Sequence, residues 1–126
     1  MPGKIRVMIA VDHPIMLEGL RMTLGKQTDM EIVCEALDAA AVLRDFAVCA
    51  PDVTIIDLQR PPGEGGRAIK ALRMKFPSCA IVVLTTYPGE GAGAGNGVPP
   101  TLELPKTASG VEVIAAVRRG AQPSRP

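Results

Sequence analysis

Four polar residues stand where apolar segments of the chain end, and together they could do chemistry. They are Asp12, Asp57, Thr85 and Lys106. Two carboxylates a few ångströms apart repel each other unless a cation lies between them, and their hard oxygen atoms are ligands that Mg²⁺ prefers. With an ammonium and a hydroxyl group beside them, such a pair suits attack of a carboxylate on a phosphoryl group. Taken singly, each residue is typical of a strand end or an exposed surface, so this prediction depends on all four meeting.

The elements that would position these residues follow from hydrophobic periodicity, which switches repeatedly between strand and helix. The expected strands are Ile5–Val11, Met30–Cys34, Val53–Ile56, Ala80–Leu84 and Leu102–Leu104, the last confined to an edge by Pro105. The expected helices begin near Pro14, at the capping residue Asp38, after a turn over Pro61–Gly66, and at a capping box formed by Ser109 and Glu112.

Strands that alternate with helices predict an α/β fold with a mostly parallel sheet covered on both faces. Right-handed crossovers place the carboxyl ends of all the strands on one edge of such a sheet. The four polar residues would therefore converge there, where open α/β sheets bind their ligands.

The segment from residue 88 to residue 101 interrupts this alternation. It holds five glycines between Gly89 and Gly97 and then Pro99-Pro100. Glycine and proline both disfavour helices, so we expect a flexible loop where the pattern calls for a fourth helix.

Size and composition fit one compact domain. The chain has 126 residues, 47% of them hydrophobic, with 14 basic and 13 acidic residues and a net charge of +1. This balance gives no long-range attraction to nucleic acid or membranes, and no apolar run reaches the roughly 20 residues of a membrane-spanning helix. Cys34, Cys49 and Cys79 lack metal-ligand spacing and predict reduced, buried thiols in a cytoplasmic protein.

The residues at the strand ends resemble the receiver domains of bacterial two-component response regulators. The resemblance lies in Val11-Asp12-His13-Pro14, Ile56-Asp57-Leu58-Gln59, Leu84-Thr85-Thr86-Tyr87 and Leu104-Pro105-Lys106. These motifs are most similar to those of the NarL/FixJ branch. The resemblance covers residues 4–87 and 106–120. It implies a flavodoxin-like three-layer sandwich with a five-stranded parallel sheet. The strand order of this fold is 2-1-3-4-5. We expect the receiver domain to span residues 1–120, with a tail or linker stub over 121–126.

The resemblance also implies a role for each site residue. Asp57 would accept a phosphoryl group from a histidine kinase, and Asp12, Asp57 and the backbone carbonyl of Gln59 would bind Mg²⁺. Lys106 would contact the phosphoryl oxygens, and Thr85 would move towards them. Gln59 and Tyr87 would flank the site and influence how fast the acyl phosphate hydrolyses. The domain would assist its own phosphorylation and dephosphorylation without being an enzyme.

Three positions depart from the pattern of the family. Val11 stands where the first of two adjacent acidic residues is usual, which predicts weaker Mg²⁺ binding. Arg60 replaces a common methionine; its guanidinium could reach Asp57 or a phosphoryl group, or simply point into solvent. Glu103 stands where the family has an aromatic switch residue, which puts the usual coupling to Thr85 in doubt.

These departures leave two hypotheses open. The first is a phosphoryl-accepting switch that contributes to transcription regulation, with a histidine kinase as partner, a homodimer as a second expected assembly, and DNA contacted only through a C-terminal domain that residues 120–126 cannot supply. The alternative is an atypical pseudo-receiver, a protein-interaction module that does not depend on phosphorylation. Binding of a phosphoryl mimic would distinguish them.

Overall fold

The computed structural model describes residues 3–86 and 101–122 of the chain. Its five strands form one parallel sheet in the order β2-β1-β3-β4-β5. The strands are β1 (Ile5–Val11), β2 (Met30–Ala36), β3 (Val53–Asp57), β4 (Ala80–Thr85) and β5 (Leu102–Pro105). The predicted flavodoxin-like fold and strand order are confirmed, with β2 two residues longer than expected.

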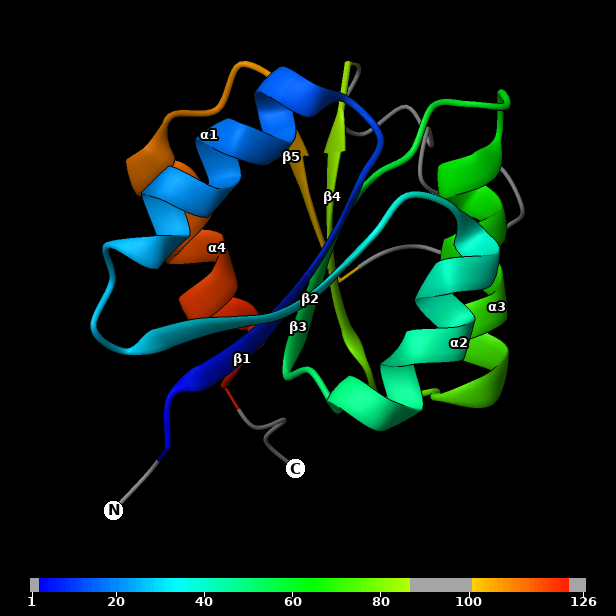
Figure 1. The fold of residues 1–126 in the computed structure, drawn as a ribbon, viewed down its shortest axis with the longest axis horizontal. Coiled ribbons are helices and arrows are strands. Elements are labelled where there is room, and N and C mark those ends of the chain that lie inside the picture. The colour runs from blue at the N-terminus through cyan, green and yellow to red at the C-terminus, as the bar shows by residue number, and fades with distance from the viewer. Residues whose placement is uncertain (1–2, 87–100, 123–126) are drawn as a thin grey trace.

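Four helices cover the sheet in the described part of the chain. They are α1 (Pro14–Gly25), α2 (Ala39–Cys49), α3 (Glu64–Lys75) and α4 (Gly110–Gly120). Helices α1 and α4 lie over one face and helices α2 and α3 over the other (Figure 1). The label α4 therefore belongs to the C-terminal helix. The loop predicted over 88–101, in place of a helix between β4 and β5, lies outside the described residues except for Thr101.

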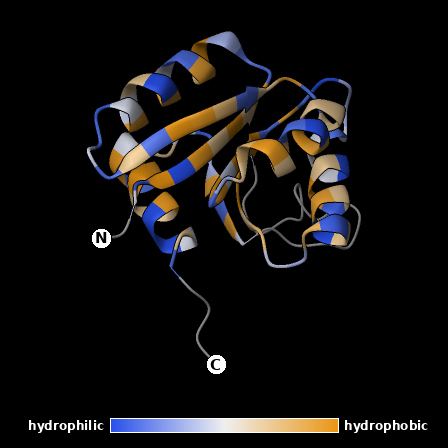
Figure 2. Ribbon diagram, turned by 60° about the horizontal axis from the view of Figure 1, so that its bottom comes forward, coloured by the Kyte–Doolittle hydropathy of each residue, from blue (hydrophilic) through white to orange (hydrophobic). Residues whose placement is uncertain are grey.

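The side chains of the strands alternate between two cores, because successive residues of a strand point to opposite faces. Ile9, Ile55 and Val82 pack under α1 and α4, whereas Met8, Ile56 and Val83 pack under α2 and α3. Figure 2 shows the result, with largely hydrophobic central strands and helices that mix hydrophilic and hydrophobic residues. A sheet buried on both faces explains why the strand sequences are almost continuously apolar.

Local capping fixes where the helices begin. The Asp38 side chain accepts a hydrogen bond from the amide of Ala41, and Ser109 and Glu112 form the predicted capping box at the start of α4. Pro14 occupies the first turn of α1, where its missing N–H costs no hydrogen bond. These contacts orient the helices that follow the strand ends.

The prediction for the turn before α3 was wrong, because the helix begins at Glu64 and not after Gly66. Gly63 allows this early start with a backbone φ of 85°, a left-handed conformation that favours glycine. The amide of Gly65 donates to the Leu58 carbonyl at 3.0 Å. A Cβ atom at residue 65 would lie 3.2 Å from that oxygen, so this helix start sits tightly against the end of β3.

Glu64 connects the starts of α2 and α3. It is 9% exposed, and one carboxylate oxygen accepts from the Ala39 amide at 2.8 Å while the other accepts from Arg67 at 3.1 Å. The first bond satisfies an N–H that the first turn of α2 leaves unpaired.

Candidate functional site

The carboxyl edge of the sheet brings together the residues that the sequence pointed to. Asp57 and Thr85 are the last residues of β3 and β4, and Asp12 and Lys106 directly follow β1 and β5. Asp57 and Thr85 are each 3% exposed. The fold therefore places two groups at the centre of the edge in nearly full burial, where polar contacts decide what they can do.

Asp57 is held by two donors on one oxygen. The Lys106 ammonium lies 3.2 Å from Asp57 Oδ1, and the side-chain amide of Gln59 donates to the same oxygen at 2.9 Å. A buried carboxylate requires such partners, because burying an uncompensated charge is costly. The predicted proximity of Lys106 and Asp57 is thus present in the structure.

Asp12 is held by the backbone that follows β3. Its Oδ2 accepts from the amide of Gln59 at 2.8 Å and from the amide of Arg60 at 2.9 Å. The amide of Asp12 in turn donates to the carbonyl of Asp57 at 3.3 Å. These three bonds fix the carboxylate of Asp12 beside the end of β3 and shape the loop that leads to α3.

Thr85 lies on the other side of Asp57. Its carbonyl accepts from the Lys106 amide at 3.0 Å, which ties the end of β4 to the residue after β5. Thr85 and Asp57 line a common cavity of about 110 Å³, together with Gly65 and Gly66 of α3. The glycines keep this side of Asp57 open, because a larger side chain in the first turn of α3 would fill the space.

A second cavity lies over the two carboxylates. It has a volume of about 270 Å³ and is lined by Asp12, His13, Met16, Asp57, Gln59, Arg60 and Lys106. Within residues 3–86 and 101–122, neither Asp57 Oδ2 nor Asp12 Oδ1 accepts a hydrogen bond from the protein. Each carboxylate therefore keeps one oxygen for a ligand.

The donor set fits a hard cation such as Mg²⁺. The cavity offers two carboxylates, lies against Gln59 and has room for water, which is the kind of sparse oxygen site that Mg²⁺ accepts. The described residues contain no group of three or more His, Cys, Asp or Glu side chains that could hold a metal ion by themselves, consistent with only two acidic residues at this edge.

Val11 explains the missing third carboxylate. Val11 is paired with Asp57 across β1 and β3, so the two side chains share one face of the sheet. Val11 is 1% exposed and belongs to the core under α1 and α4. An apolar side chain thus takes the place next to Asp57 from which an acidic residue would reach the site.

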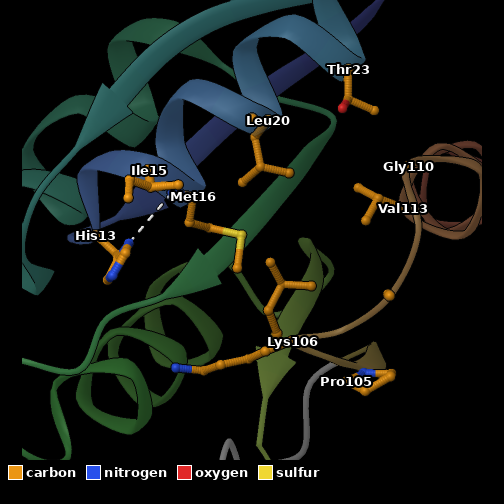
Figure 3. Close-up of a pocket in the computed structure, with 12 residues that line it drawn as sticks. His13, Ile15, Met16, Leu20, Thr23, Pro105, Lys106, Gly110 and Val113 are labelled. Carbon is orange, nitrogen blue, oxygen red and sulfur yellow. Dashed lines mark hydrogen bonds between the residues drawn. The ribbon is translucent and has the colours of Figure 1, made fainter.

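An apolar groove of about 340 Å³ adjoins the site between α1 and α4, and it shares His13, Met16 and Lys106 with the cavity over the carboxylates. In Figure 3, Leu20 and Val113 form its floor, whereas the Lys106 ammonium points away from them. His13 is exposed and is the N-cap residue of α1. Its ring nitrogen Nδ1 accepts a hydrogen bond from the Met16 amide at 3.5 Å. This capping contact gives His13 a structural role at the start of α1.

The cysteines lie outside the site. All three are free thiols and are half-buried, not fully buried as the sequence suggested. Burial, with the neighbouring Cys49 thiol, raises the pKa of Cys34 to about 12, and burial also raises the pKa of Cys79. Both thiols therefore stay protonated near neutral pH, the less reactive form of cysteine.

Two features of the site were not foreseen from the sequence. These are the contact between the Gln59 side chain and Asp57, and the double amide contact of Asp12. Both depend on the backbone path after β3, for which Pro61-Pro62-Gly63 was the only signal. Tyr87, predicted to flank the site, lies outside the described residues.

None of the helices in the described segments is long and apolar enough to cross a lipid bilayer.

The chain is similar in sequence to regulatory proteins of bacteria. Two relatives are the transcriptional regulatory protein YhcZ of Bacillus subtilis, 37% identical over 66% of this chain, and the oxygen regulatory protein NreC of Staphylococcus haemolyticus, 38% identical over 68% of it. The matched region spans only 39% and 40% of the length of these relatives.

Solved structures agree with the sequence relatives. The signal receiver domain of NarL from Mycobacterium tuberculosis is similar with a TM-score of 0.82 and 26% identity, covering 95% of this chain and 98% of that domain. The isolated receiver domain of RcsB from Salmonella enterica serovar Typhimurium, solved with the phosphomimetic BeF3⁻, has a TM-score of 0.77 and 29% identity and covers 94% and 91% of the two chains. The response regulator receiver domain family matches residues 7–92. The chain therefore belongs to the receiver domains of two-component response regulators and is similar to those of the NarL type.

Proposed function

We propose that Asp57 accepts a phosphoryl group from a histidine kinase and that this modification is the signal the domain carries. The observation that supports it most is the buried Asp57 carboxylate with the Lys106 ammonium at 3.2 Å. Lys106 can follow the negative charge from the carboxylate to the incoming phosphoryl oxygens without a large movement. Receiver domains act with histidine kinases as signalling proteins and are not enzymes in their own right, and the proposal assigns this chain the same role.

The transfer has a simple bond balance. One oxygen of Asp57 forms a bond to phosphorus while the P–N bond of the donor phosphohistidine breaks, and the imidazole nitrogen keeps the electron pair of that bond. Asp57 Oδ2 has no hydrogen-bond donor among the described residues, which leaves it available for this attack. Mg²⁺, held by Asp12, Asp57 and the Gln59 carbonyl, would supply positive charge against the phosphoryl oxygens.

Two residues beside Asp57, Thr85 and Gln59, would interact with its phosphorylated form. Phosphorylation replaces a single negative charge with a larger anion carrying three strong acceptors. The Thr85 side chain shares a cavity with Asp57 and would move towards these acceptors. Gln59, which already contacts Asp57, would influence how fast the acyl phosphate hydrolyses.

Incubation with acetyl phosphate and Mg²⁺, followed by intact-mass spectrometry, tests the proposal. We expect a single added phosphoryl group on the wild type and none on Asp57→Ala. Asp45→Ala serves as the control, because Asp45 lies on α2 and pairs with Arg44 away from the site. An unmodified wild type, or an adduct that persists in Asp57→Ala, would refute the proposal and leave the pseudo-receiver as the better hypothesis.

The partners beyond the kinase are part of the same proposal. YhcZ and NreC are regulatory proteins of which this chain spans about two fifths, so we infer a contribution to transcription regulation through a DNA-binding segment distinct from the receiver. The net charge of +1 gives the receiver itself little attraction to DNA. Homodimer formation and a cytoplasmic location, which the free thiols suit, complete the proposal.

A further inference from the structure

Arg60 occupies a defined place beside the phosphorylation site although its side chain is exposed. Its amide donates to Asp12 Oδ2 at 2.9 Å, which anchors the residue at the rim of the two carboxylates. Arg60 lines the 270 Å³ cavity that Asp12, Asp57 and Lys106 also line. A long arginine side chain that starts at this rim can extend its guanidinium towards an anion in the cavity.

The Arg60 guanidinium has no structural task in the described residues. Six other arginines use their side chains to bind acidic groups or backbone carbonyls. They are Arg6, Arg21, Arg44, Arg67, Arg73 and Arg118. Within residues 3–86 and 101–122, Arg60 shares the lack of a side-chain partner only with Arg119, which lies beside a different cavity near the end of α4.

The charges of the cavity favour a role in binding an anion. Without a bound metal ion, two carboxylates and the Lys106 ammonium leave the site with one excess negative charge, and Arg60 brings the formal sum to zero. A phosphoryl group on Asp57 adds further negative charge and three strong acceptor oxygens. A guanidinium can then donate two parallel hydrogen bonds to the phosphoryl oxygens, a geometry that a lysine cannot provide.

We propose that Arg60 binds the phosphoryl oxygens of modified Asp57 as a second cation opposite Lys106. This inference rests on the proposed function of Asp57 and goes beyond it by naming a residue that strengthens the hold on the anion. The loss of one acidic residue at Val11 and the gain of a base at Arg60 then act in the same direction, since both make the site less negative.

Beryllofluoride is the probe for this inference, because it mimics the phosphoryl group without requiring a donor protein; the related RcsB domain was solved in its presence. Its affinity for the full 126-residue chain is measured by isothermal titration calorimetry at one saturating Mg²⁺ concentration. The variants are Arg60→Met, Arg60→Lys and Arg119→Met. Arg119→Met is a matched control that removes the same charge at another exposed position, beside a different cavity.

We expect Arg60→Met to bind beryllofluoride about tenfold more weakly than the wild type, the order of magnitude for one charge-assisted contact. Arg60→Lys should fall between the two, and Arg119→Met should bind like the wild type. Thermal unfolding without the probe should be the same for all four proteins, because neither the Arg60 nor the Arg119 side chain has a hydrogen-bond or ion-pair partner among the described residues.

Two outcomes would overturn the inference and leave the function of Asp57 intact. One is wild-type affinity in Arg60→Met, and the other is an equal loss in Arg60→Met and Arg119→Met, which would indicate net charge alone. A wild-type chain that binds beryllofluoride no better than Asp57→Ala would instead reject the proposed function itself.

Discussion

At the scale of single residues, the site depends on how the buried Asp57 carboxylate is compensated. Lys106 and Gln59 share its Oδ1, and no other side chain in the described residues donates to it. The Lys106 side chain is 30% exposed and the Asp57 side chain only 2%, so the ion pair lies at the boundary between core and solvent. Removing the ammonium should therefore affect both stability and chemistry.

The variant Lys106→Met tests this compensation. Without the ammonium, Asp57 keeps only the Gln59 contact, and we expect the free energy of unfolding to fall by about 1–3 kcal/mol in the absence of divalent cations. Saturating Mg²⁺ should recover part of the loss. Urea unfolding measures both effects, and Lys70→Met, an exposed substitution on α3, is the control. A Lys106→Met chain as stable as this control would show that the pair contributes nothing.

Val11 provides a second prediction at the same scale. Because Val11 and Asp57 share a face of the sheet, Val11→Asp places a third carboxylate beside the site, and Mg²⁺ affinity should rise about tenfold or more. The same change should destabilise the metal-free protein by about 1–3 kcal/mol, since the position is buried. Metal titration and urea unfolding give the two values. Val11→Asn, polar but neutral, should show the destabilisation without an equal gain in affinity.

At the scale of secondary-structure elements, ion pairs connect the helices to the edge of the sheet. Arg21 of α1 binds Glu35 of β2 through two contacts of 2.6 Å, and Arg118 of α4 binds Asp29 just before β2 at 2.9 Å. Both ion pairs link helices of the same layer, α1 and α4, to β2 or the residue before it. Strand β2 is the edge strand on the side of the sheet opposite to β5.

The Arg21–Glu35 pair predicts a pH dependence. The hydrogen bond that Arg21 donates to Glu35 lowers the pKa of the Glu35 carboxyl group below its usual value. A carboxyl group whose pKa is lowered in the folded state adds stability above its unfolded pKa and loses it as the pH falls through the folded pKa. Glu35→Gln should therefore cost a few tenths to about 1 kcal/mol at pH 7, and the cost should be smaller near pH 3. Urea unfolding at the two pH values checks this, and an equal cost at both would contradict it.

The elements were largely predictable from the sequence, but the contacts between them were not. The alternation of strands and helices and the capping residues Asp38 and Ser109 indicated the fold, because both are local patterns. The site residues Asp12, Asp57, Thr85 and Lys106 could be predicted because the topology of a parallel sheet brings its strand ends together. The role of Glu64 in joining α2 to α3 depends on the separate packing of two helices. No local pattern around residue 64 could reveal it.

At the scale of the whole molecule, one sheet separates two cores. The core under α1 and α4 contains Ile55, and the core under α2 and α3 contains Ile69. Both residues are fully buried. Since the strands contribute to both cores alternately, we expect the two cores to unfold together.

The variants Ile55→Val and Ile69→Val test this arrangement. Each should lower the free energy of unfolding by about 0.5–1.5 kcal/mol. Their effects should add within about 0.5 kcal/mol in the double variant, because the two side chains lie on opposite faces of the sheet. Unfolding followed by circular dichroism and by amide exchange should remain one transition in all three. A separate early transition in either variant would show that the layers unfold independently.

The one-oxygen contacts of Asp12 and Asp57 also bear on which ions the domain can distinguish. Asp12 Oδ2 accepts from two amides and Asp57 Oδ1 contacts Lys106 and Gln59, so each carboxylate would present mainly its other oxygen to a bound metal ion. Ca²⁺ favours six to eight oxygens and often grips both atoms of a carboxylate, whereas Mg²⁺ is content with one apiece and keeps its waters. If Asp12 and Asp57 hold a cation as proposed, these hydrogen bonds would therefore favour Mg²⁺ over Ca²⁺.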